Sequence, residues 1–202
     1  MGLPPTPPLP YDAEVEYLES TGTQRIDTGI MYDSSVVVET KVYVLTSDTG
    51  KTVFGIYWDG GGGAQRWNFQ AVTSSPYGNA QMGTKQKPFA LPKNTWVTLH
   101  ADYRYITSNG TSYDSGASAF NPTDDVEIPI FARHLVYTQN THDSYINMRL
   151  ESFQITKGGV LVRDFVPVRV GQVGYLYDEV SGQLFGNAGT GSFLYGNDVF
   201  NS

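Results

Sequence analysis

The 202-residue chain contains no cysteine, and charged residues make up only 16% of it. The absence of cysteine excludes disulfides and metal sites built on thiolates, and it leaves the redox compartment open. The formal net charge is −7, and an acidic chain without clustered Lys and Arg is unsuited to the phosphates of nucleic acid. We therefore expect no nucleic-acid partner.

Long apolar runs are also missing. No stretch of 18 or more apolar residues occurs, so we expect no insertion into a membrane. The opening MGLPPTPPLP lacks the basic flank and apolar core of a signal peptide. It holds five prolines, which fix φ and remove backbone donors. Residues 1–10 are therefore predicted to form an extended linker or docking arm.

What remains is a composition typical of β-proteins, with 14 Tyr and 22 Gly. Residues 36–44 carry valine or threonine at every second position, and residues 97–103 repeat the alternation with Val97, Leu99, Ala101 and Tyr103. Such alternation indicates strands with one buried face. No window carries a sustained helical period, so helix is expected to be rare.

Turn signals separate the predicted strands. Lys157-Gly158-Gly159 and Ser181-Gly182 are expected in hairpin turns. The apolar phase slips between Leu150 and Phe153, which predicts a β-bulge near Glu151 or Ser152. We predict an all-β fold: one antiparallel β-sandwich over residues 11–202, preceded by the proline-rich arm.

Three blocks carry a resemblance to a known family: residues 14–30 (EVEYLESTGTQRIDTGI), residues 128–135 with 148–169, and residues 173–193. In this order they resemble a laminin-G-like domain of the concanavalin A-like jelly-roll superfamily. The variety is that of bacteriophage tail, fibre and head appendages and of surface proteins of gut bacteria. The resemblance covers nearly the whole chain.

The resemblance implies a non-enzymatic carbohydrate-binding or adhesion domain, located in a virion or at a cell surface, with a cell-surface glycan as its partner. It implies that the N-terminal arm joins virion or surface-assembly proteins, and a homotrimer is one expected state. A purely structural domain that decorates such an assembly is the alternative, and a glycan hydrolase is a third.

The first block is predicted to serve the fold rather than chemistry. Tyr17 and Leu18 are expected to pack on the core, while Gly22 and Gly29 permit bends that a Cβ would block. Gln24 and Asp27 have short polar side chains suited to holding turns. We therefore expect no catalytic residue in this block.

The candidate ligand-binding residues are Tyr57, Trp58, Arg66, Trp67 and Tyr77. Exposed aromatics with polar neighbours are what sugar-binding proteins use. Trp58 and Trp67 flank a glycine-rich tip, 59–64, which is expected to be mobile, and they are expected to face each other across a hairpin. Either could instead be a core residue, so Trp58 and Arg66 are favoured over Trp67 for ligand contact. Tyr77 is expected near this group.

Catalytic residues are predicted to be absent. The alternating carboxylates of jelly-roll glucanases do not occur, and Asp124, Asp125 and Glu127 form the nearest acidic cluster. Because Pro122 and Pro129 bracket that cluster, we expect it in a solvated turn at a sheet edge.

Metal sites have equally little support. The three histidines are His100, His134 and His142, which we expect to be scattered over the surface. No resident metal is predicted, although laminin-G-like domains often hold a calcium ion at the rim. The acidic residues that could contribute to such a site are Asp59, Asp114, Asp124, Asp125 and Asp143.

Overall fold

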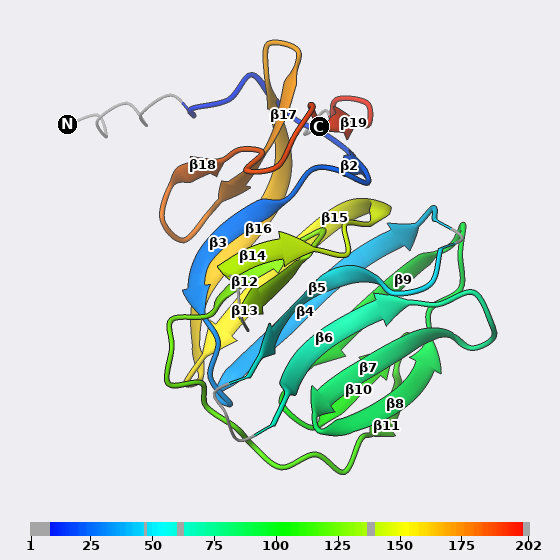
Figure 1. Cartoon of the computed structure of the whole chain (residues 1–202). Helices are drawn as coiled ribbons and strands as arrows, with labels where there is room; N and C mark the ends of the chain where they lie inside the picture. The colour runs from blue at the N-terminus through cyan, green and yellow to red at the C-terminus, as the bar shows by residue number, and fades with distance from the viewer. Residues whose placement is uncertain (1–8, 47, 60–62, 137–139, 200–202) are drawn as a thin grey trace.

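The computed structural model describes residues 9–46, 48–59, 63–136 and 140–199, and these form an all-β molecule of two packed sheets (Figure 1). The predicted arm lies almost entirely outside the described residues. No helix in the described part of the chain could span a membrane. The predicted all-β sandwich is therefore confirmed, with strand pairings that are antiparallel except between β5 and β13.

Eleven of the described strands build the larger sheet, in the order β11-β10-β9-β4-β15-β16-β17-β18, with β1 beside β16 and β2 between β15 and β19. Its strands are β1 (Ala13–Glu14), β2 (Leu18–Thr21), β4 (Val36–Val44), β9 (Trp96–Ala101), β10 (Tyr105–Ser108), β11 (Thr111–Asp114), β15 (Asn147–Lys157), β16 (Val160–Val170), β17 (Val173–Asp178), β18 (Gln183–Phe185) and β19 (Leu194–Tyr195).

Eight described strands build the smaller sheet, in the order β14-β13-β5-β6-β7-β8, with β12 joining β3 to β5. Its strands are β3 (Ile26–Met31), β5 (Lys51–Trp58), β6 (Gln65–Ala71), β7 (Tyr77–Gly83), β8 (Lys85–Ala90), β12 (Glu127–Ile130), β13 (Arg133–Val136) and β14 (Asn140–Asp143).

The core fills the space between the two sheets. In β4 the side chains at 36, 38, 40, 42 and 44 are all buried, as the alternation predicts. From the smaller sheet, Phe54, Trp67 and Phe69 are fully buried, and the ring of Phe54 lies 5.4 Å from that of Phe153 in the larger sheet. Burial of such rings is the main stabilising term for a sandwich.

The predicted turns and bulge are confirmed. β15 ends at Lys157 and β16 begins at Val160, with Gly158 at φ 58° and Gly159 at φ 79°. Both values suit a two-residue hairpin turn that glycine adopts without strain. The pairing of β15 with β4 shifts register between Leu150 and Ser152, so Glu151 is the extra residue of a bulge.

The first sequence block holds two distant parts of the chain together. Gln24 is buried, and its Oε1 accepts a hydrogen bond from the Thr21 amide at 2.8 Å, while its Nε2 donates to the Ser192 carbonyl at 3.0 Å. Gly22 and Gly29 have positive φ, as their expected bends require. The expectation for Tyr17 is wrong: Leu18 is buried in the core, whereas Tyr17 faces outward and lines a surface hollow.

The expected solvated position outside a strand is confirmed for Asp124 and Asp125, but not for Glu127. Asp124 and Asp125 are exposed, but Glu127 opens β12, which pairs with β3 on one side and with β5 on the other. Pro129 fits inside this strand because the register with β3 shifts between Glu127 and Pro129. Such an irregularity removes the need for a ladder donor that proline lacks.

Candidate functional site

One row of side chains crosses the outer face of the larger sheet. Glu19 of β2 pairs with Arg149 of β15, Arg149 pairs with Tyr43 of β4, and Tyr43 pairs with Trp96 of β9. The outward direction of each side chain follows from strand alternation, because its neighbours along the strand, such as Val42 and Val97, point into the core. Four strands thus present one aromatic or charged side chain each in a single register.

The aromatic members of this row contact one another and a third ring. Trp96 lies 5.4 Å from Tyr43 and 6.3 Å from Tyr17, measured between ring centroids. The Arg149 guanidinium lies over Tyr17 at 4.5 Å and over Tyr43 at 5.4 Å, and Lys41 lies over Trp96 at 5.7 Å. Cation–π contacts of this kind attract a cation to a ring face by about 0.5–1 kcal/mol at exposed sites.

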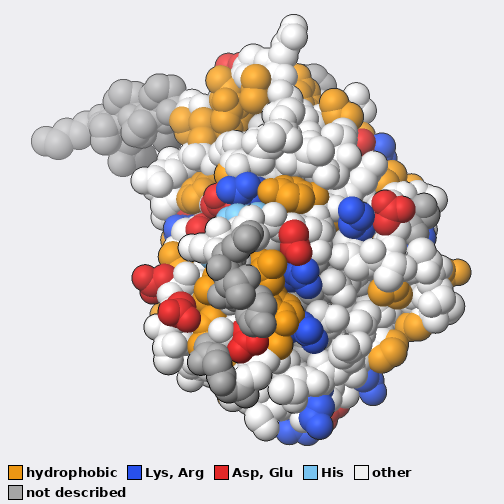
Figure 2. Space-filling model, in the orientation of Figure 1, with side chains coloured by type: hydrophobic (Ala, Val, Ile, Leu, Met, Phe, Trp, Pro, Cys, Tyr) orange, Lys and Arg blue, Asp and Glu red, His pale blue; other side chains and the backbone are white. Residues whose placement is uncertain are grey.

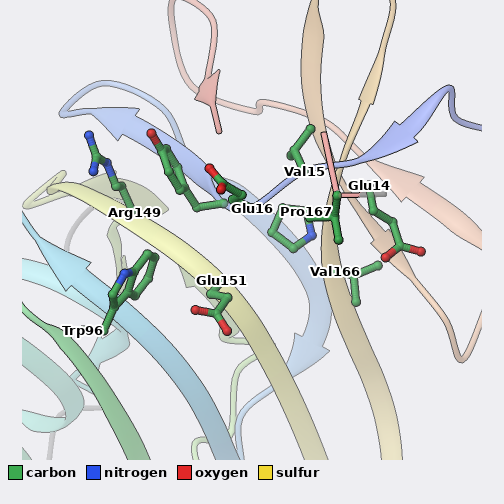
Figure 3. A pocket seen from close by; sticks show the side chains of 10 residues that line it. Glu14, Val15, Glu16, Trp96, Arg149, Glu151, Val166 and Pro167 are labelled. Carbon is green, nitrogen blue, oxygen red and sulfur yellow. The ribbon is translucent and has the colours of Figure 1, made fainter. Parts of the chain in front are cut away.

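Three of these side chains, those of Tyr17, Trp96 and Arg149, border a hollow of about 480 Å³ (Figure 3). Trp96 and Arg149 stand on one side of it, Val166 and Pro167 on the other, and Glu151 lies between them. We call this hollow the aromatic pocket; its lining residues are Glu14, Val15, Glu16, Tyr17, Trp96, Arg149, Glu151, Val166, Pro167 and Val199. Its volume lies within the range of small-molecule sites.

The β-bulge of β15 shapes this pocket. Glu151 is the unpaired extra residue, and a bulge turns such a side chain away from its regular alternation. Its carboxylate lines the pocket and binds Lys41 Nζ at 2.8 Å. The bulge therefore supplies an oriented carboxylate beside Trp96.

A second hollow of about 600 Å³ adjoins the first. Tyr17 and Arg149 line both hollows, and the second is completed by residues of β19 and by Gln172 of the β16–β17 turn. The two hollows are thus neighbours with the Tyr17–Arg149 pair between them, and we call the two together the groove.

Arg149 is paired with a carboxylate, whereas Glu16 is bound by neutral donors. Arg149 Nε donates to Glu19 Oε2 at 2.6 Å, and this hydrogen bond raises the pKa of Arg149. Glu16 Oε2 accepts from the backbone and side chain of Asn197. Carboxylates and guanidinium N–H groups fixed next to aromatic rings are suited to the hydroxyl groups of a sugar.

The ligand-binding residues predicted from the sequence lie elsewhere, on the smaller sheet. Tyr57 and Arg66 are direct partners across β5 and β6, and the Arg66 guanidinium lies 4.6 Å from the Tyr57 ring centroid. Arg133 also approaches this ring, at 5.5 Å. On this side of the molecule charged side chains of both signs are interspersed, without a continuous area of one sign (Figure 2).

The two tryptophans of the predicted site do not face each other, which corrects that expectation. Trp58 pairs with Gln65, whereas Trp67 pairs with Ile56. Trp67 is fully buried and donates from Nε1 to the Asp102 carbonyl at 2.7 Å, so it is a core residue. Trp58 is half-buried and donates to Asp124 Oδ2 at 2.6 Å. Part of the predicted mobile tip falls on residues 60–62, outside the described residues.

Tyr77 is exposed and lies at the other end of the β6–β7 pair, because Gly78 pairs with Ala71 while Gly83 pairs with Arg66. Five intervening residues of an extended strand separate the two ends by roughly 15 Å or more. The structure therefore brings Tyr57 and Arg66 together but leaves Tyr77 apart from them.

The histidines are not all scattered, contrary to the sequence-based expectation. His134 and His142 are cross-strand partners in β13 and β14, and their rings stack at 4.6 Å with an angle of 15°. Burial, followed by the charges of Arg25 and His134, lowers the pKa of His142 to about 4. His100 is separate, on the outer face of the larger sheet beside Glu39.

Within the described residues, no group of three or more His, Asp or Glu side chains is placed to hold a metal ion. Two of the acidic residues considered for calcium, Asp114 and Asp143, form ion pairs with Arg104 and Arg133. Calcium at the rim rests on the family resemblance alone.

The aromatic pocket was missed because its members lie far apart in the sequence. Tyr17, Trp96 and Arg149 of the pocket, and Tyr43 beside it, come from four strands or strand ends, and no motif joins them. The available signal was alternation: Tyr43 and Trp96 fall on the outward face of strands whose inward face is plainly apolar. Outward aromatics on adjacent strands are the feature that would have found the site.

Comparison with known proteins adds a structural likeness. No family model and no curated protein matches the chain. A solved structure from Bacteroides ovatus ATCC 8483, described as a "putative carbohydrate binding protein", superposes with a TM-score of 0.56 at 13% sequence identity. The match covers 91% of this chain and 61% of that one, so this chain spans less than two thirds of its length. At this identity the likeness establishes a shared β-sandwich fold.

Proposed function

We propose that this protein is a non-enzymatic carbohydrate-binding domain whose ligand site is the aromatic pocket. The observation that carries the proposal is the cross-strand row of Glu19, Arg149, Tyr43 and Trp96 beside a hollow of about 480 Å³. A sugar ring presents an apolar face and polar edges, so it needs an aromatic surface with hydrogen-bonding groups around it. The pocket provides both from rigid strands.

The neighbouring hollow extends the proposal to an oligosaccharide. Because Tyr17 and Arg149 line both hollows, a chain of sugar units can continue past them without leaving the groove. The structural likeness to the Bacteroides ovatus protein, which is described as carbohydrate binding, supports a carbohydrate ligand. The family resemblance of the sequence supports a finer proposal: a laminin-G-like jelly roll that adheres to glycans at a cell surface, as part of a virion or of a bacterial surface assembly.

A glycan-array screen of the purified full chain tests this function. We expect the wild-type protein to bind a restricted set of glycans, and the Trp96→Ala protein to lose that binding. Trp67→Phe is the matched control, because Trp67 is a core residue on the other sheet and the change leaves the pocket intact. Absence of wild-type binding on a broad array, or equal binding by Trp96→Ala, would contradict the proposal.

A second candidate function is assembly with other copies. Val170 and Val173 face each other across the β16–β17 turn and are 36% and 43% exposed. Contiguous exposed apolar patches of several hundred Å² mark association surfaces, and this valine pair would form part of such a patch. Sedimentation velocity would test it: a concentration-dependent oligomer that Val173→Ser dissociates supports this function, and a monomer at all concentrations argues against it.

A further inference from the structure

The lining of the aromatic pocket carries more negative than positive charge. Glu14, Glu16 and Glu151 are among its lining residues, whereas Arg149 is the one Lys or Arg among them. Because the chain as a whole is acidic, distant residues do not reverse this local sign.

The ion pairs around the pocket leave this excess in place. Arg149 is bound by Glu19, and Glu151 is bound by Lys41. Counting Glu19 and Lys41 with the lining adds one negative and one positive charge. The excess of negative charge is therefore the same with or without them. Glu16 and Glu14 instead bind neutral donors, namely Asn197 and the Tyr11 hydroxyl. Neither of these partners neutralises a carboxylate.

The aromatic rings, like the carboxylates, favour a cationic ligand over an anionic one. The faces of Trp96 and Tyr17 are electron-rich, and the structure already places the cations of Lys41 and Arg149 over them. A ring face attracts cations and repels anions. A ligand carboxylate in this pocket would therefore meet electron-rich rings and the Glu16 carboxylate, while Arg149 and Lys41 are already paired with Glu19 and Glu151.

From this arrangement we propose that the aromatic pocket selects its sugar by charge: it takes neutral pyranoses and sugars with a free amino group, and it rejects uronic and sialic acids. This inference rests on the proposed function and names its ligand class. The ammonium group of an amino sugar gains from the pocket carboxylates and the Trp96 face. A uronate loses through the same groups, by about three- to tenfold in affinity for one or two unit charges at contact range across a solvated surface.

The probes that test the inference are methyl glycosides of the gluco and galacto series, each as the neutral sugar, the 2-amino sugar and the uronate. The readout is the indole N–H signal of Trp96 in the ¹⁵N-labelled full chain, assigned with Trp96→Phe. The indoles of Trp58 and Trp67 serve as internal controls, because both donate to acceptors away from the pocket. Titrations run near pH 6, where carboxylates and the amino group are both charged.

We expect the Trp96 signal to move with neutral and amino sugars, and the amino sugar to bind at least about threefold more tightly than the matched uronate. Equal binding of uronate and neutral sugar, or tighter binding of the uronate, would overturn the charge selection while leaving the proposed function standing. No movement with any of the six probes would contradict the proposed function itself, so the two failures are distinguishable.

A charge-removing pair of variants provides the second measurement. Glu151→Gln removes one carboxylate from the pocket, and the ratio of uronate to neutral-sugar affinity should rise about two- to fivefold. Glu39→Gln changes the net charge equally on the same sheet face, but Glu39 does not line the pocket. An unchanged ratio in folded Glu151→Gln, or an equal rise in both variants, would contradict selection by the pocket.

Discussion

At the scale of single residues, the three tryptophans have three different roles. Trp67 is buried between the sheets, Trp58 is half-buried beside Asp124, and Trp96 stands at a surface hollow. Their roles follow from the strand face each occupies rather than from residue type. Sequence reasoning could name aromatic candidates, but it could not tell which of them faced solvent.

Replacing two of these tryptophans should separate packing from binding. We expect Trp67→Ala to lower the free energy of unfolding by about 3 to 5 kcal/mol, because it leaves a large cavity in a packed core. Trp96→Ala should lower it by about 1 kcal/mol or less, since its side chain is only half-buried at the surface. Urea denaturation of both variants checks this, and a core-sized loss for Trp96→Ala would contradict its surface role.

His142 gives the protein a specific sensitivity to acid. Burial and the charges of Arg25 and His134 lower its pKa from 6.5 to about 4, while Asp27 and Asp143 act in the opposite direction. As pH falls from 6.5 to about 4, His142 binds a proton in the unfolded chain but stays neutral in the folded chain. Stability is therefore complete above pH 6.5 and falls towards pH 4, by about 1 to 3 kcal/mol from this group.

The His142→Gln variant should show a shallower loss of stability between about pH 6.5 and pH 4 than the wild type. His100→Gln is the matched control, because His100 is a surface histidine paired with Glu39. Thermal melts at a series of pH values measure how steeply stability falls with pH. An unchanged slope in His142→Gln would show that His142 does not cause the loss of stability.

At the scale of elements, the sequence predicted local features better than distant ones. The alternation of β4, the turn at Gly158-Gly159 and the bulge at Glu151 all depend on adjacent residues, and all three are confirmed. The expected turn position of Glu127 failed because this residue opens β12, whose partners lie far away in the chain: β3 at Glu127 and β5 at Ile130. Strand pairing over such distances leaves no local pattern.

The loop between β18 and β19 is hydrogen-bonded to the first sequence block, residues 14–30. The amide of Thr190 donates to the Thr23 carbonyl at 3.0 Å, and the amide of Arg25 donates to Asn187 Oδ1 at 3.1 Å. Gly189 lies against this contact, and a Cβ added there would approach the Thr23 carbonyl oxygen to an impossible distance. Only glycine permits such an approach of two backbones.

We therefore expect Gly189→Ala to lower the free energy of unfolding by about 2 kcal/mol or more, because backbone on both sides must move. Thr190→Ala, at the next position, keeps the amide that bonds to Thr23 and should change stability by less than about 1 kcal/mol. Equal stabilities of the two variants in denaturant melts would argue against the close contact at Gly189.

At the scale of the whole molecule, strand order rather than any motif creates the candidate site. Tyr43, Trp96 and Arg149 are brought together because β4 lies between β9 and β15, and Glu19 joins them because β2 pairs with β15. Composition and alternation were enough to predict a sandwich. The site itself depends on which strands are neighbours, and that information appears only in the fold.

The N-terminal arm is predicted to be independent of this sandwich. The backbone hydrogen bonds that tie the N-terminal end to the sandwich include one at Asp12, whose amide donates to the Arg169 carbonyl. Deleting residues 1–10 should therefore leave the melting temperature nearly unchanged, since five prolines are unsuited to a strand within a sheet. A drop of more than about 5 °C in calorimetry would show that the arm belongs to the fold.

The central claim is that the outer face of the larger sheet, rather than the Tyr57–Arg66 cluster of the smaller sheet, holds the glycan. The most direct measurement is calorimetric titration of an array-positive glycan into the wild type, Trp96→Ala and Arg66→Ala. We expect Trp96→Ala to weaken binding at least about tenfold, or about 1.4 kcal/mol, and Arg66→Ala to leave it unchanged. Full affinity in Trp96→Ala together with lost binding in Arg66→Ala would contradict the account and place the ligand on the smaller sheet.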